Sequence, residues 1–288
     1  MDDGATDPKQ LSERIAHSSA WVRSVKEEIS RVLVGQHNLV DRLLIGLLCN
    51  GHILLEGMPG LAKTLSVKAL AGTLNLGFAR LQFTPDLLPA DLVGTMIYNP
   101  NEQTFAPKLG PVFANVILAD EINRAPAKVQ SALLEAMQER QGTLGETSYP
   151  LPTPFLVLAT QNPIDQEGTY QLPEAQLDRF LLKVAVSYPE KDEELLILDR
   201  MASTAPPEET KQVVNAESIH ASRRLLDEIY IDHALREYIV DIVNATRYPA
   251  KVDTRLKTLL RSGASPRASI DLALTARARA FMDGRSFV

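Results

Sequence analysis

The chain has 288 residues, 45% of them hydrophobic, which is enough for one large domain or two smaller ones. Its formal net charge of -6 argues against a dedicated nucleic-acid-binding protein, because such proteins usually carry a basic stripe. A single cysteine, Cys49, excludes an internal disulfide, and no apolar run approaches the roughly 20 residues that a membrane span needs. The acidic, polar first residues are unlike a signal or transit peptide, so we expect a cytoplasmic protein without membrane insertion.

The N-terminal part of the chain is predicted to become helical after a flexible start. Residues 1–18 are expected to be flexible, because polar terminal segments commonly fray. Apolar residues then recur at helical spacing over 19–33, and a second helical pattern covers 36–49.

Short apolar runs alternate with helical stretches in the next part of the chain. The helical stretches include 63–74 and 127–139, and the apolar runs are 52–57, 78–83, 115–121, 155–161 and 180–186. This alternation is typical of a parallel sheet covered by helices, so the sequence predicts an α/β fold.

Two segments interrupt the alternation. Residues 94–111 contain short alternating pieces around Asn99-Pro100-Asn101, and residues 140–154 contain two glycines and three prolines. Both patterns predict β-hairpins. After Tyr188-Pro189 the pattern becomes helical with few strand signals, so we place a domain boundary near Pro189, between an α/β domain over 19–189 and a helical domain over 190–288.

The first chemical motif lies between the run at 52–57 and the helix that follows it. Gly57 and Lys63-Thr64 have the spacing of a phosphate-binding loop, G-x-x-x-x-G-K-[ST], which stands between a strand and a helix. Backbone N–H groups of such a loop surround phosphate oxygens at a helix N-terminus. Lys63 would reach the β- and γ-phosphates and Thr64 would hold Mg²⁺, whereas the alternative is a strand–turn–helix that only resembles this loop.

Ala62 replaces the glycine that usually precedes the lysine of this loop. The phosphates need only an N–H from this position, and alanine supplies one. We expect position 62 to lie in the first helical turn, where φ is negative, so that alanine fits without strain.

The second motif is the apolar run that ends in Asp120-Glu121. Carboxylates at the carboxyl end of a buried parallel strand lie where open α/β sheets bind ligands. Asp120 would face Mg²⁺, directly or through water, and Glu121 would orient and deprotonate an attacking water. A solvated acidic turn is the alternative for the pair alone, and the phosphate-binding loop upstream argues against it.

Three further positions have both a functional and an ordinary interpretation. Asn162 follows a buried strand and could position water or the γ-phosphate, or could simply begin a turn. Arg179 precedes a strand and is either an arginine finger or a surface partner of Asp178. Arg267 stands in the first turn of a helix that Ser265 would cap, where its charge opposes the helix dipole; its anionic partner is either a γ-phosphate or Asp271.

Taken in this order, the motifs resemble an AAA+ ATPase from about residue 19 to the end of the chain. The segments GMPGLAKT, FTPDLLPADLVG, LADEINRAP, EGTYQLPEAQLDRF and GASPRA are more specifically similar to the MoxR family, which commonly has alanine before the loop lysine. The resemblance implies an AAA+ P-loop parallel-sheet core with β-hairpin inserts, followed by a small all-α lid domain. The family's lid normally extends beyond the last residues, FMDGRSFV, so we expect the final lid elements to be missing here.

The resemblance also assigns roles to individual residues. It implies that Asp120-Glu121 is the Walker B motif, with Thr64 and Asp120 at Mg²⁺. Glu121, Asn162 as sensor 1, Arg179 as the arginine finger and Arg267 as sensor 2 would take part in catalysis, and Arg124 would be a second interface arginine. ATP would contact Val34, Gly35, Gln36, Gly57, Met58, Pro59, Gly60, Leu61, Ala62, Lys63, Thr64 and Leu65.

The function implied is that of an ATP-hydrolysing motor that remodels or activates protein partners. The family resemblance implies a homo-oligomeric ring, expected to be a hexamer, and protein clients that include von Willebrand factor A-type domains. The alternatives are the motor subunit of a metal chelatase, a nucleic-acid motor, and a nucleotide-gated binding module without turnover. A nucleic-acid motor would need basic, aromatic hairpin tips, and here Lys108 is offset by Glu102 and Glu146. A module without turnover would have no need of Glu121.

Overall fold

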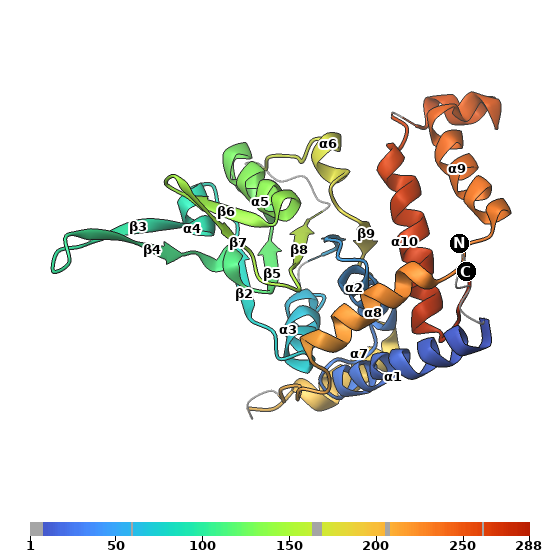
Figure 1. Cartoon of the computed structure of the whole chain (residues 1–288), viewed down its shortest axis with the longest axis horizontal. Coiled ribbons are helices and arrows are strands. Elements are labelled where there is room, and N and C mark those ends of the chain that lie inside the picture. Colours follow the sequence, from blue (N-terminus) through green and yellow to red (C-terminus); the bar gives the residue numbers. More distant parts are fainter. Residues whose placement is uncertain (1–7, 59, 163–168, 205–207, 261) are drawn as a thin grey trace, which may run out of the picture. The chain divides into compact units, whose positions relative to one another are not determined.

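The computed structural model describes residues 8–58, 60–162, 169–204, 208–260 and 262–288 (Figure 1). It divides into two compact units, one formed by Met1–Arg23 with Glu217–Val288 and the other by Ser24–Ala216. We call them the helical unit and the α/β unit. No helix in the described ranges is both long and apolar enough to cross a membrane.

The α/β unit is built on a five-stranded parallel sheet with the strand order β2-β5-β8-β1-β9. Each expected apolar run contributes one strand, which confirms the predicted α/β fold. The strands are β1 (Ile53–Glu56), β2 (Phe78–Gln82), β5 (Val116–Asp120), β8 (Leu156–Gln161) and β9 (Leu182–Ala185). The central strands β5 and β8 are almost fully buried, as expected for a parallel sheet with both faces covered.

Helices cover this sheet and bury its apolar side chains. The core includes Phe83, Phe155 and side chains of β5, β8 and the helix α5. The helices of this part are α2 (His37–Leu48), α3 (Lys63–Thr73), α4 (Pro89–Val93), α5 (Ala127–Glu139) and α6 (Glu174–Leu177), with 3-10 turns η1 (Pro111–Phe113) and η2 (Ile122–Arg124).

Both predicted hairpins are present. The first is formed by β3 (Gly94–Asn99) and β4 (Thr104–Leu109), and the second by β6 (Gln141–Leu144) and β7 (Thr147–Pro150). Figure 1 shows the β3–β4 hairpin projecting away from the sheet, with the β6–β7 hairpin beside its base. Tyr98 and Phe105 face each other across β3–β4 with ring centroids 5.2 Å apart, and both rings are largely exposed.

Two boundaries differ from the expectation. The segment 1–18 was expected to be flexible, but α1 (Pro8–Val32) is a helix from Pro8 onward, because Leu11 and Ile15 continue the apolar stripe of the residues after 19. The boundary expected near Pro189 falls instead between Ala216 and Glu217, so α7 (Lys191–Met201) and the strap, which we define as residues 208–215, belong to the α/β unit.

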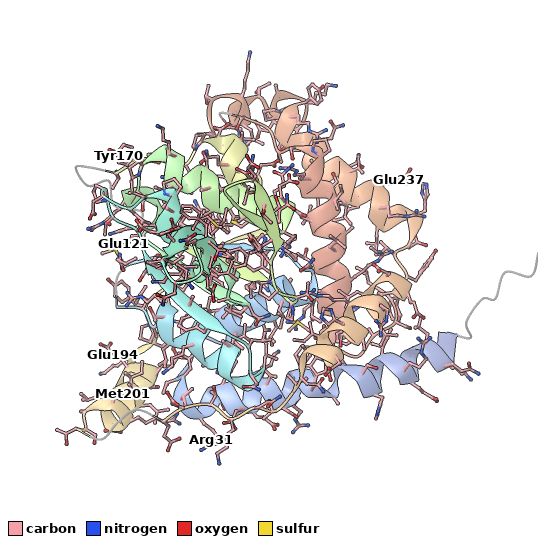
Figure 2. All side chains as sticks on the ribbon, turned by 60° about the vertical axis from the view of Figure 1, so that its left-hand side comes forward. Arg31, Glu121, Tyr170, Glu194, Met201 and Glu237 are labelled. Atoms are coloured by element: carbon pink, nitrogen blue, oxygen red, sulfur yellow. The ribbon has the colours of Figure 1, made fainter. Side chains whose placement is uncertain are left out.

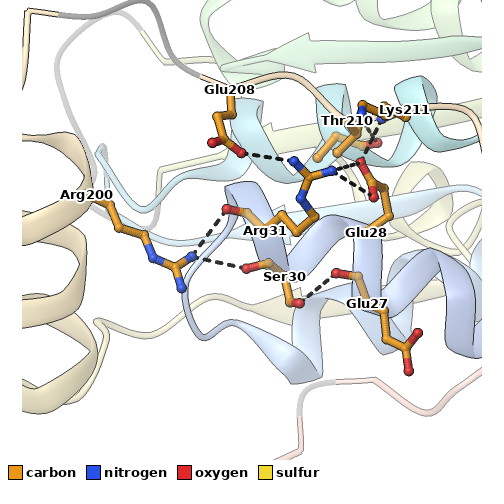
Figure 3. A network of polar contacts seen from close by, with 9 residues as sticks. Glu27, Glu28, Ser30, Arg31, Arg200, Glu208, Thr210 and Lys211 are labelled. Carbon is orange, nitrogen blue, oxygen red and sulfur yellow. Dashed lines mark hydrogen bonds and ion pairs between the residues drawn. The ribbon is translucent and has the colours of Figure 1, made fainter.

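Polar contacts explain why α7 and the strap stay with the sheet (Figure 3). Arg200 of α7 donates to the carbonyl oxygens of Ser30 and Arg31 at the C-terminal end of α1. Arg31 pairs with Glu28 and with Glu208 of the strap. The Glu28 carboxylate also accepts from the backbone N–H of Lys211 at 2.8 Å, and this bond is the main reason that the pKa of Glu28 is lowered.

The helical unit combines the first part of α1 with α8 (Ala216–Glu228), α9 (His233–Arg247), α10 (Pro266–Met282) and the 3-10 turns η3 (Pro249–Lys251) and η4 (Thr254–Thr258). Trp21 of α1 donates to Ser222 of α8 at 3.0 Å, and Arg14 pairs with Glu228. A helical C-terminal domain was expected, and α8, α9 and α10 form it.

Candidate nucleotide-binding site

The described residues of the loop between β1 and α3 include two glycines whose positions restrict other side chains. Gly57 comes directly after β1 and lies close to the backbone of Val186. A Cβ at position 57 would lie 2.8 Å from the carbonyl oxygen of Val186, which explains why this position is glycine. Gly60 has φ +85°, a conformation that glycine adopts readily. The Lys63 ammonium donates to the carbonyl oxygen of Gly57 at 2.7 Å and so crosses the loop. Pro59, which was expected to contact ATP, lies outside the described residues.

The expectation for Ala62 was wrong. Ala62 is the N-cap of α3 and has φ 55° and ψ 19°, so it lies in the left-handed region, whereas we expected a helical conformation with negative φ. The helix begins at Lys63, and the chain must turn sharply to enter it. The Ala62 carbonyl oxygen is fixed by Ser66, whose N–H and hydroxyl both donate to it at 2.9 Å. Alanine therefore occupies a position that favours glycine, at a cost of about 1–2 kcal/mol.

A cavity of about 430 Å³ opens over this loop. Its wall joins the loop to the carboxyl ends of β2, β5 and β8, where ligands bind in open α/β sheets. It is lined by Gly57, Gly60, Leu61, Ala62, Lys63, Thr64, Leu65, Arg80, Gln82, Asp120, Glu121, Thr160 and Asn162. The structure thus brings most of the predicted loop residues, both carboxylates of Asp120-Glu121 and Asn162 to one cavity.

Asp120 is the last residue of β5, and both of its carboxylate oxygens have hydrogen-bond donors. The Thr160 hydroxyl donates to Oδ1 at 2.6 Å. The Arg80 guanidinium donates to Oδ2 through Nη2 at 2.6 Å and through Nε at 3.2 Å. The Asp120 carboxylate therefore faces the cavity in an ion pair with Arg80, and only 15% of its side chain is exposed.

Glu121 (labelled in Figure 2) follows β5 directly and has a strained backbone, with φ 56° and ψ 51°. Its N–H donates to the Thr160 hydroxyl at 2.8 Å. Its carboxylate accepts from the Gln82 amide at 2.9 Å and pairs with Arg124 at 3.0 Å. The expected base is thus held by two side chains on the cavity rim, and Arg124 takes part in this site through Glu121.

The turn after Glu121 is held by a buried amide. Gln130 of α5 is 1% exposed, and its Nε2 lies 2.9–3.2 Å from the carbonyl oxygens of Ile122, Ala125 and Tyr170. The carbonyl groups of Ile122 and Ala125 would otherwise be buried without donors, so Gln130 fixes the path of the chain next to Glu121.

Lys63 has a lowered pKa because burial disfavours its charged form, an effect that the nearby carboxylates of Asp120 and Glu121 partly offset. Its ammonium contacts a carbonyl oxygen instead of a carboxylate. A polyphosphate in the cavity would supply the negative charge that a partly buried ammonium needs.

Other predicted residues lie outside this cavity wall. Arg179 follows α6, and its half-buried guanidinium makes no hydrogen bond or ion pair within the described residues, so the expected surface pair with Asp178 is not formed. Arg267 lies in the first turn of α10 in the helical unit, where its N–H donates to the Ser265 hydroxyl at 3.1 Å. The predicted roles of these two arginines remain predictions, as does that of Met58.

The segment Val34-Gly35-Gln36 is held by α7 and the residues before it. Gln36 donates to the carbonyl oxygen of Ser187 at 3.1 Å. Gly35 has φ +63°, and a Cβ there would lie 2.5 Å from the Glu193 carboxylate. Gly35 lines a separate cavity of about 140 Å³, so the predicted contact of residues 34–36 with ATP remains a prediction.

Three residues of the cavity wall were missed at the sequence level: Arg80, Gln82 and Thr160. The run FARLQF does carry a signal, because Arg80 and Gln82 alternate with apolar residues and so share one face of β2 near its carboxyl end. Thr160 carries none, since threonine is an ordinary strand residue.

Comparison with known proteins agrees with this geometry. A family model described as "ATPase family associated with various cellular activities (AAA)" matches residues 52–182, and an AAA lid domain model matches residues 252–288. Chaperone MoxR1 of Mycobacterium tuberculosis is 50% identical over 262 residues, which are 91% of this chain and 69% of that protein. Protein MoxR of Paracoccus denitrificans is 32% identical over 300 residues, which are 96% and 86% of the two chains.

The chain belongs to the MoxR family of AAA+ ATPases. A solved structure of a Cytophaga hutchinsonii protein is 49% identical and has a TM-score of 0.89, covering 97% of this chain and 85% of that one. For a MoxR-family protein, the expected ligand is a nucleotide with Mg²⁺. The donor set fits that ligand, because N–H groups and Lys63 suit phosphates while Thr64 and Asp120 offer the oxygen ligands that Mg²⁺ prefers.

Proposed function

We propose that this MoxR-family chain binds ATP with Mg²⁺ in the 430 Å³ cavity and hydrolyses it. The observation that carries the proposal is the meeting of Lys63 and the loop N–H groups with the two carboxylates of Asp120-Glu121 in one cavity wall. A site that only bound an anion would gain nothing from two carboxylates, because they repel it.

The residues divide the work according to their positions. The loop 57–62 and Lys63 hold the β- and γ-phosphates, and Thr64 with Asp120 would hold Mg²⁺, which neutralises charge as the terminal phosphate leaves. Glu121 takes a proton from the attacking water. Gln82 and Arg124 both contact the Oε2 atom of Glu121, so the proton would pass to Oε1.

We further propose that hydrolysis takes place in a homo-oligomeric ring of the expected hexameric kind. Support comes from Arg179, whose guanidinium has no partner among the described residues of its own chain and lies outside the cavity wall. An arginine that stabilises the γ-phosphate from the side opposite Lys63 would then come from a neighbouring subunit. In this proposal Arg267 contributes from the lid as sensor 2.

The output of the cycle is proposed to be the remodelling of protein clients in the cytoplasm, including von Willebrand factor A-type domains. The β3–β4 hairpin supports this part, because it exposes Ile97, Tyr98 and Phe105 on a projecting element that contributes nothing to the cavity wall. Exposed apolar side chains on such an element are typical of protein contacts.

Two variants separate binding from turnover. Lys63→Ala is expected to lose nucleotide binding, and Glu121→Gln is expected to bind ATP but not hydrolyse it, because only the base is lost. Binding is measured with a fluorescent ATP analogue and hydrolysis by phosphate release. Lys108→Ala, which removes a cation from the exposed β4, is the control and should behave as wild type. Hydrolysis by Glu121→Gln at the wild-type rate would remove Glu121 from the role of base.

A further inference from the structure

Arg80 contacts Asp120, the carboxylate that is expected to hold the metal ion. Arg80 is on β2, the edge strand of the sheet, and its guanidinium reaches the Oδ2 atom of Asp120 with two donors, at 2.6 and 3.2 Å. The other oxygen of Asp120 is engaged by the Thr160 hydroxyl. No carboxylate oxygen of Asp120 is therefore left without a donor.

The register of the sheet produces this contact. Gln82 pairs with Asp120 in the β2–β5 ladder, so Arg80 lies two residues back on the same face of β2. The guanidinium also donates from Nη2 to the Gln82 amide oxygen at 3.3 Å, while the amide nitrogen of Gln82 donates to Glu121. Arg80 is thus oriented at two points, although half of its side chain is exposed.

Mg²⁺ and this guanidinium compete for the same oxygen. Mg²⁺ binds carboxylate oxygens at about 2.0–2.1 Å in strict octahedral geometry. Oδ2 accepts two N–H bonds and has no lone pair left for the ion, whereas Oδ1 accepts one bond, from Thr160, and keeps one lone pair. Two cations within a few ångströms also repel each other strongly in a half-buried site.

We propose that Arg80 is the resident counter-ion of Asp120 and weakens the binding of a divalent cation there until it leaves Oδ2. This inference rests on the proposed function, because it assigns a metal-binding role to Asp120. In the nucleotide-free chain, Arg80 keeps Asp120 neutralised and disfavours binding of a bare cation. Nucleotide phosphates provide an alternative partner for the released guanidinium, so metal and nucleotide bind cooperatively.

Direct metal binding without nucleotide is the first test. Mn²⁺ alone is titrated into the full chain and followed by electron paramagnetic resonance, for wild type, Arg80→Met and Arg80→Lys. We expect Arg80→Met to bind Mn²⁺ about five- to tenfold more tightly than wild type, and Arg80→Lys to lie between them, since lysine keeps the charge but loses the two-point fork. Adding Asp120→Asn to Arg80→Met should abolish the gain, which locates it at Asp120.

Nucleotide binding provides the second measurement. A fluorescent ATP analogue is titrated in EDTA and at increasing Mg²⁺ concentrations. In Arg80→Met the Mg²⁺ concentration for half-maximal effect should fall by a similar factor, while affinity in EDTA should weaken because Asp120 then faces the phosphates with its full charge. Lys108→Met removes one positive charge from the exposed hairpin of the same unit and should change neither quantity.

The possible results separate this inference from the proposed function. Unchanged or weaker Mn²⁺ binding in Arg80→Met, in a wild type that binds nucleotide normally, overturns the role of Arg80 alone. A wild type that binds no nucleotide overturns the proposed function and this inference with it. Circular dichroism and melting curves check folding, and Arg80→Gln replaces Arg80→Met if the latter unfolds.

Discussion

Replacing Ala62 by glycine should stabilise the nucleotide-free protein, although substitutions by glycine usually destabilise. Ala62 has φ 55°, and a left-handed conformation costs a residue with a Cβ about 1–2 kcal/mol. Glycine removes this strain, but it also raises the conformational entropy of the unfolded chain, which lowers the free energy of unfolding by about 0.4–1 kcal/mol. The difference predicts that the free energy of unfolding rises by about 0.5–1 kcal/mol. Both hydrogen bonds from Ser66 go to the Ala62 carbonyl oxygen and are retained.

Urea denaturation and thermal melting without nucleotide measure this change. For a domain of 150–250 residues, about 1 kcal/mol corresponds to roughly 2–4 °C, so the transition of the α/β unit should rise by about 1–4 °C. Ala127→Gly makes the same chemical change at an exposed position in the first turn of α5 and should lower stability by about 0.5–1 kcal/mol. If Ala62→Gly lowers stability as much as Ala127→Gly, the strained conformation is not the one that the protein adopts in solution.

Three further substitutions test other parts of the structure. Burial, and secondarily the charge of Arg140, lowers the pKa of His52 from 6.5 to about 3, so the unfolded state binds a proton that the folded state refuses. The free energy of unfolding should therefore fall by up to about 1.4 kcal/mol per pH unit as the pH drops from 6.5 toward 3. Urea denaturation of His52→Gln at several pH values should show a pH dependence smaller by the contribution of one proton. An unchanged pH dependence would contradict the buried neutral imidazole. Gln130→Met should cost about 2 kcal/mol in the same assay, because the buried carbonyl groups of Ile122 and Ala125 lose their donor, and a loss below about 0.5 kcal/mol would mean that water replaces the amide. Arg179→Ala should bind ATP but lose most hydrolysis, and mixing it with Lys63→Ala subunits should restore some phosphate release; full activity of Arg179→Ala alone would refute a role in trans.

The sequence predicted the elements of the α/β unit because each has its own local signal. The parallel strands are short runs of apolar residues, and the hairpins carry the glycine and proline residues of turns. The prediction of a boundary near Pro189 was wrong, because the sequence pattern becomes helical there although the chain continues to contact the α/β unit as far as Ala216. Arg200 keeps α7 with the α/β unit and the pair Arg31–Glu208 keeps the strap there, and both contacts join residues far apart in sequence.

The candidate site divides in the same way. Lys63 follows the loop after β1, Asp120 ends β5 and Glu121 comes next. Because the carboxyl ends of parallel strands meet at one edge of the sheet, their convergence could be predicted. The partners of these residues could not. Arg80 reaches Asp120 only because β2 is the neighbour of β5. The order of the strands in a sheet cannot be predicted from the sequence of any one strand.

Backbone conformation at the site was the hardest feature to predict, and Thr160 explains why. Thr160 is 1% exposed. Its hydroxyl accepts a hydrogen bond from the N–H of Glu121 and donates one to the Oδ1 atom of Asp120. One buried oxygen thereby fixes the last strand residue and the left-handed residue that follows it. Strain of this kind persists only where surrounding contacts over-determine it. The φ angle of Glu121 is therefore set by a neighbouring strand, and a pattern read along β5 alone would always extend the strand through it.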